Sequence, residues 1–75
     1  MHNWFIVDSQ GNIQFRGDLN TILQQALRTR DNSPEKLDVW KVKAYWKLTN
    51  KFYREYASVR EFIEAYYLGD RDSSI

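Results

Sequence analysis

The chain lacks cysteine altogether and has one histidine, one proline and three glycines among 75 residues. Without cysteine it can form no disulfide framework, no thiolate zinc site and no thiol nucleophile. One histidine, His2, cannot build a multi-histidine metal site. The glycines each stand at the end of a predicted element and form no phosphate-cradling loop. We therefore expect no metal site and no cofactor.

Paired carboxylates for acid–base catalysis are also missing, because Glu61 and Glu64 have helical spacing but follow a predicted helix cap. His2 stands beside the terminus, where we expect it to be mobile. A domain this small also leaves little volume for a substrate pocket. We expect that the protein is not an enzyme.

No hydrophobic run approaches the ~18 residues of a membrane span. The apolar stretch at residues 2–7 has no basic region before it and ends at Asp8, so it does not match a signal peptide. We expect a cytoplasmic protein without a membrane partner. The length fits a single domain, which we place at residues 1–69, with residues 70–75 as a frayed tail.

Aromatic residues are abundant, with three Trp, five Tyr and four Phe. A small domain buries a limited fraction of its surface, and each large ring can bury roughly 150–250 Å². The aromatic content is therefore expected mainly to stabilise a small core that has no disulfides.

The N-terminal segment, up to Gly17, predicts a β-hairpin. Residues 4–7 are β-branched or aromatic, residues 13–16 alternate apolar with polar, and Asp8–Gly11 suits the turn between them. Four side chains are expected to form one apolar face toward the helices: Phe5, Val7, Ile13 and Phe15. Trp4 and Ile6 then point to the opposite face.

A helix is predicted over residues 19–30, with Asp18 as its N-cap. Its apolar residues recur at helical spacing: Leu19, Ile22, Leu23, Ala26 and Leu27. Residues 31–36 follow as a loop, because Pro34 disfavours helical backbone at Ser33.

Residues 40–48 alternate strictly and predict a strand. One set is expected to point at the helices: Trp40, Val42, Ala44, Trp46 and Leu48. The other set is expected to point outward: Lys41, Lys43, Tyr45 and Lys47.

Residues 50–68 allow two interpretations. One long helix is possible, but Phe52–Ala57 favours a strand, and Ser58–Glu61 is a capping box that would be wasted in the middle of a helix. We prefer the strand, followed by a helix that starts after Ser58 and ends near Gly69.

These elements predict an α+β fold of order ββαββα, with a four-stranded antiparallel sheet and two helices on one face. The two halves match in pattern when Asp18 is aligned with Ser58, although no residue in 1–30 is identical to its counterpart. The alternative is ββαβα with one C-terminal helix at residues 50–68.

Charge is unevenly distributed along the chain, although the formal net charge is only +1. Residues 41–60 carry six basic side chains and one acidic one, a net charge of +5, whereas residues 61–75 carry a net charge of −3. The basic block falls on the second hairpin. We predict a binding face on the uncovered side of the sheet, formed by Trp4, Lys41, Lys43, Tyr45, Lys47, Lys51 and Arg54.

Two functions fit such a face. The leading hypothesis is a small regulatory or binding module that contacts another protein, because Trp and Tyr on an open sheet are typical of interface hot spots. The alternative is a single-stranded RNA or DNA binder, in which lysines neutralise phosphates and aromatic rings stack on bases. A homodimer with a structural role is a third possibility.

Overall fold

The computed structural model describes residues 1–69, and the predicted tail at 70–75 lies outside the described residues. The elements follow in the order β1 (His2–Val7), β2 (Ile13–Gly17), α1 (Leu19–Asn32), η1 (Pro34–Lys36), β3 (Lys41–Trp46), β4 (Phe52–Tyr56), α2 (Val59–Ile63) and η2 (Glu64–Gly69). The predicted ββαββα order is confirmed, with η1 as an added 3₁₀ turn. The alternative helix over 50–68 is wrong, because β4 occupies its first part.

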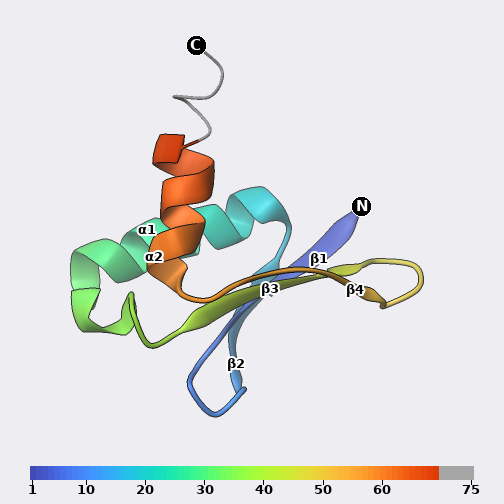
Figure 1. The fold of residues 1–75 in the computed structure, drawn as a ribbon, viewed down its shortest axis with the longest axis horizontal. Helices are drawn as coiled ribbons and strands as arrows, with labels where there is room; N and C mark the ends of the chain where they lie inside the picture. Colours follow the sequence, from blue (N-terminus) through green and yellow to red (C-terminus); the bar gives the residue numbers. More distant parts are fainter. Residues whose placement is uncertain (70–75) are drawn as a thin grey trace.

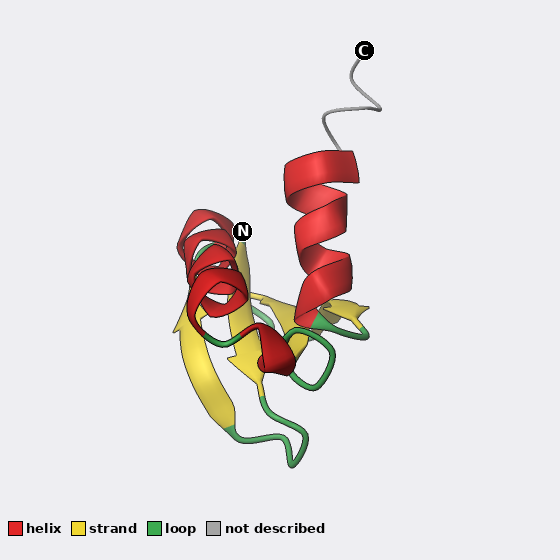
Figure 2. Ribbon diagram, turned by 90° about the vertical axis from the view of Figure 1, so that its left-hand side faces the viewer, coloured by secondary structure: helices red, strands yellow, loops and turns green. Residues whose placement is uncertain are grey.

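The four strands form one antiparallel sheet in the order β2-β1-β3-β4. Both helices lie on one side of this sheet (Figure 1). Helix α1 lies across the sheet, whereas α2 and η2 rise away from it as one column (Figures 1 and 2). The helical layer therefore leaves one end of the sheet uncovered.

Strand β1 is central, and its pairing with β3 decides which way its side chains point. Trp4 lies opposite Ala44 and Ile6 lies opposite Val42. Paired residues of an antiparallel ladder share a face, and Val42 and Ala44 are fully buried on the helix side. Trp4 and Ile6 therefore point toward the helices, and the predicted orientation of β1 is wrong.

The first hairpin contains a shift of register that the sequence pattern does not reveal. Val7 lies opposite Ile13 as predicted, but Phe15 lies opposite Ile6 instead of Phe5. Gln14 is the extra residue of a β-bulge, so the side chains of Ile13 before it and Phe15 after it point to opposite faces of the sheet. Phe15 therefore packs against the core, whereas Ile13 does not.

The core combines sheet and helix side chains: Trp4, Ile6, Ile22, Ala26, Leu37, Val42, Ala44, Val59, Phe62 and Ile63. The Trp4 ring lies 5.7 Å from the Phe62 ring and 5.8 Å from the Tyr66 ring, measured between centroids. Aromatic rings thus connect the sheet to the C-terminal column, in agreement with their expected stabilising role.

Both predicted helix caps are present. The carboxylate of Asp18 accepts a hydrogen bond from the Thr21 amide at 2.8 Å, and the Ser58 hydroxyl accepts one from the Glu61 amide at 3.2 Å. Helix α1 runs two residues further than predicted, and the Ser33 amide closes it by donating to the Thr29 carbonyl.

Strand β3 ends earlier than the alternation suggests, because the chain turns after Trp46. The Asn50 amide donates to the Trp46 carbonyl at 2.8 Å, and Asn50 adopts a positive φ of 56°. Leu48 lies in this turn and is 99% exposed, while Trp46 is 44% exposed. Trp46 points to the helix side as predicted, although it stays partly exposed, whereas the prediction that Leu48 points at the helices is wrong.

Substitution of Trp4 tests the revised orientation of β1. Trp4 is 3% exposed, so Trp4→Ala is expected to lower the free energy of unfolding by about 3–5 kcal/mol, measured by urea denaturation. Leu48→Ala is the control, because its side chain is exposed, and it should change stability by less than about 0.5 kcal/mol. A small effect of both substitutions would place Trp4 at the surface and contradict the structure.

Candidate functional site

The sheet face away from the helices, here called the open face, carries the alternate side chains of all four strands. It is formed by Asn3, Phe5, Val7, Ile13, Arg16, Lys41, Lys43, Tyr45, Phe52 and Glu55. These residues alternate with the side chains that point toward the helices. Half of them are apolar or aromatic, so the open face is far from a purely polar, solvated surface.

A row of rings crosses the open face from β1 to β4. The Phe5 and Tyr45 rings lie 5.8 Å apart, and the Tyr45 and Phe52 rings lie 6.1 Å apart, both edge to face. Phe52 is 59% exposed and Ile13 is 57% exposed. Large apolar side chains therefore remain in contact with solvent on this face.

Beside this row lies a shallow hollow of about 370 Å³, lined by Phe5, Val7, Gly11, Ile13, Lys43, Tyr45 and Asn50. Val7 is only 5% exposed although it does not belong to the core cluster under the helices. Its neighbours on the open face therefore already form a small packed apolar surface. A protruding apolar group of a partner could fill the hollow.

Basic groups surround the apolar row. Arg16 and Lys41 are exposed, and the Lys43 ammonium lies 3.9 Å from the Glu55 carboxylate. Such a solvent-exposed pair contributes little to stability. Three basic groups against one carboxylate leave the open face with a net positive charge.

The structure separates the residues of the predicted binding face. Lys41, Lys43 and Tyr45 lie on the open face as predicted. The predicted place of Trp4 on this face is wrong, because β3 pairing turns its ring into the core. Tyr53, a possible addition in one register, packs against the core instead.

The other predicted basic residues lie elsewhere. Lys47 and Lys51 flank the β3–β4 turn instead of extending the strand row. Arg54 lies opposite Ala44 and so belongs to the helix side, where its guanidinium lies 5.6 Å from the centre of the Tyr53 ring. It also donates a hydrogen bond to the Tyr56 hydroxyl at 3.1 Å.

Sequence reasoning missed several residues of the open face: Phe5, Val7, Ile13, Arg16 and Phe52. The signal for the first two was present in the sequence. The alignment of Asp18 with Ser58 places Trp4 in correspondence with Ala44, whose inward direction the alternation of the second half predicts. If corresponding positions of the two halves point to the same side of the sheet, Phe5 and Val7 belong to the open face.

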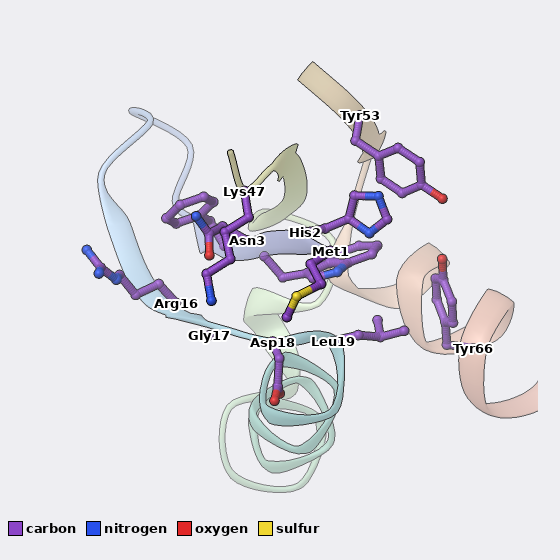
Figure 3. Close-up of a pocket in the computed structure, with 12 residues that line it drawn as sticks. Met1, His2, Asn3, Arg16, Gly17, Asp18, Leu19, Lys47, Tyr53 and Tyr66 are labelled. Carbon is purple, nitrogen blue, oxygen red and sulfur yellow. The ribbon is translucent and has the colours of Figure 1, made fainter. Parts of the chain in front are cut away.

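A second concave region lies at the end of the sheet that the helices leave uncovered, and it reaches from the helix side to the edge of the open face. This cleft of about 690 Å³ is lined by Met1, His2, Asn3, Trp4, Phe5, Arg16, Gly17, Asp18, Leu19, Lys47, Tyr53 and Tyr66 (Figure 3). Its walls come from β1, the β2–α1 junction, the β3–β4 turn, β4 and η2. The expectation of little pocket volume in so small a domain is therefore wrong.

Three rings lie together on the sheet beside the cleft and are here called the three-ring cluster: His2, Trp46 and Tyr53. The His2 ring stacks on the Tyr53 ring at 3.7 Å and lies 4.3 Å from the Trp46 ring. The Trp46 and Tyr53 rings lie 5.2 Å apart. His2 thus belongs to a paired strand and to packed rings, and the expectation that it is mobile is wrong.

Burial shifts the pKa values of two ionisable groups in this region. Loss of hydration lowers the pKa of His2, and the positive N-terminal amine adds to that effect. Among the described side chains, His2 Nε2 is the buried polar atom that lacks a hydrogen-bond partner. Burial, followed by hydrogen bonding with Tyr56, raises the pKa of Tyr66 to about 12.

Residues 1–69 contain neither a candidate metal site nor a membrane-spanning helix. Within that range no group of three or more His, Asp or Glu side chains could hold a metal ion. None of the helices in the same range is both long and apolar enough to cross a membrane.

Comparison with known proteins adds no relative. No protein-family model matches the chain, and no curated protein or solved structure is found to be similar.

The shifted Tyr66 hydroxyl gives a direct test of the packing around the cleft. An ultraviolet titration should show one tyrosine that ionises only near pH 12, instead of the ordinary value of 10.0. The raised pKa stabilises the fold below pH 10.0, and this contribution is lost as the pH rises toward 12.

Tyr66→Phe should remove that last ionisation step, whereas Tyr45→Phe should leave it in place because Tyr45 lies on the open face. Ionisation of every tyrosine near pH 10.0 in the folded protein would contradict the burial of Tyr66.

Proposed function

We propose that the protein is a small, non-catalytic binding module that contacts another protein through its open face. One observation supports this proposal above all: two large apolar side chains of the open face, Ile13 and Phe52, are more than half exposed, and a packed row of rings crosses the same face. Contiguous exposed apolar surface is uncommon on a protein that acts alone, and it marks interaction sites.

The charge of the open face indicates what the partner presents. Arg16 and Lys41 are exposed near the apolar centre, while Lys43 is partly neutralised by Glu55. A partner with apolar side chains at its centre and carboxylates at its rim would complement this arrangement. The rings would supply most of the binding free energy, and the basic groups would mainly speed association.

Single-stranded nucleic acid is the second candidate for the same face. In its favour, Lys41, Lys43 and Tyr45 stand together on the open face. Against it, Val7 and Ile13 offer no aromatic surface for bases, and Glu55 adds a negative charge that would repel phosphates. The balance favours a protein partner.

Substitutions that place a charge among the apolar side chains of the open face test the proposed interface. Ile13→Glu and Phe52→Glu alter exposed side chains of the open face, so the fold should survive. The matched controls are Val39→Glu and Leu48→Glu, which alter exposed apolar side chains outside that face.

Each variant is compared with the parent protein in affinity capture from cell extract, with quantification of every captured protein. The proposal expects at least one protein whose recovery falls about tenfold or more with both open-face variants and stays unchanged with both controls, which corresponds to about 1.4 kcal/mol. Equal recovery with all four variants would refute it. Sedimentation of the purified protein at two concentrations shows whether the partner is a second copy.

A direct titration with a fluorescent single-stranded oligonucleotide tests the second candidate. Binding at ~50 mM salt that weakens strongly at ~200 mM, and that Lys41→Gln and Lys43→Gln reduce, would favour nucleic acid over protein. The proposal expects no binding that depends on these two lysines.

A further inference from the structure

The cleft beside the three-ring cluster meets the open face only at Asn3, Phe5 and Arg16, and it has the features of a small-molecule site. We propose that it binds a planar aromatic ring that carries a phosphate or carboxylate group. The proposal does not depend on the function assigned to the open face, because the three-ring cluster lies on the helix side of the sheet.

The shape of the cleft follows from the fold. Helix α1 begins only at Leu19, and the column of α2 and η2 rises away from the sheet (Figure 2). The sheet between them is left bare at the end that carries His2 and Tyr53, so a cleft of about 690 Å³ opens there. That volume lies within the range of roughly 300–1,000 Å³ that is typical of small-molecule sites.

Aromatic side chains form one side of the cleft. His2 and Tyr53 belong to the stacked pair of the three-ring cluster, and Tyr66 faces them from η2 (Figure 3). Flat rings bind other flat rings in stacked or edge-to-face geometries, with a gain beyond simple burial. A planar ligand ring is therefore the shape that this side would bind best.

The charges around the cleft favour an anion. Lys47 lines the cleft and forms no ion pair with any described residue. The one acidic residue of the lining, Asp18, already accepts a hydrogen bond from the Thr21 amide, and its carboxylate points away from His2 and Tyr53 (Figure 3). Arg16 adds a second basic group at the rim, although its guanidinium also points away.

The single histidine supplies a hydrogen-bonding group without a partner. His2 Nε2 is buried beside the cleft and has no hydrogen bond in the described part of the chain. Met1 lies between His2 and Asp18 in Figure 3 and is 83% exposed, so its side chain could move aside at little cost. A ligand that displaced Met1 would approach the imidazole.

The experiment uses the imidazole as its own reporter, since one histidine gives one set of ring signals in a ¹H–¹³C spectrum. Four probes separate the ring from the charge: AMP, indole-3-acetate, adenosine and ribose 5-phosphate. The proposal expects saturable shifts of the His2 signals with AMP or indole-3-acetate, at dissociation constants below about 5 mM. Adenosine and ribose 5-phosphate should bind at least about tenfold more weakly than AMP.

The pattern of responses also tells the two sources of anion apart. A response to AMP alone indicates a nucleotide, and a response to indole-3-acetate alone indicates an aromatic carboxylic acid; both support a site for ring and anion. No saturable shift with either probe overturns the proposal. Where AMP binds, equal affinity for AMP and adenosine, or for AMP and ribose 5-phosphate, overturns it as well.

Paired variants in β3, β4 and the turn between them show on which side of the sheet the probe binds. Lys47→Gln should weaken binding of the active probe about three- to tenfold, while Lys41→Gln, on the open face, should not change it. Tyr53→Leu should weaken binding at least about fivefold, and Phe52→Leu, its neighbour on the opposite face, should have no effect.

Lys47 is exposed in a turn, so Lys47→Gln remains informative even if Tyr53→Leu destabilises the fold. Unchanged affinity in Lys47→Gln would overturn the assigned role of its charge. Ile13→Glu should leave probe binding intact, so failure of the open-face proposal and failure of this one are distinguished.

Discussion

The antiparallel pairing of β1 with β3 decides which side chains of this protein become core and which become surface. Trp4 lies opposite Ala44 at the centre of the sheet, and the small Ala44 side chain leaves room for the indole to reach Phe62. A shift of one residue would exchange the two faces of β1, because strand side chains alternate. The position of every ring on the sheet therefore depends on this register.

Two uncovered surfaces follow from that arrangement. Because Trp4 and Ile6 point inward, Phe5 and Val7 must point outward, and they join Tyr45 to make the open face apolar. The helices cover only part of the other face, so the three-ring cluster borders a cleft, and of its rings Tyr53 also packs against the core. With few residues to form two helices, the protein leaves both surfaces accessible to partners.

The sequence was sufficient to predict the elements but not every register. Alternation over residues 41–46 and the caps at Asp18 and Ser58 correctly predicted β3 and both helix starts, because these signals are local. The orientation of β1 was predicted wrongly, because both of its faces are apolar and its partner β3 follows only after β2 and α1 in the chain. The bulge at Gln14 and the cleft depend on tertiary packing, which no local pattern encodes.

The most direct test of this account is the set of nuclear Overhauser contacts made by the Trp4 indole protons. The structure predicts contacts with the Phe62 and Tyr66 rings, whose centroids lie 5.7 and 5.8 Å from that of Trp4. Contacts with the side chains of Lys43 and Tyr45 instead would place Trp4 on the open face. That result would contradict the register on which the core, the proposed interface and the cleft all depend.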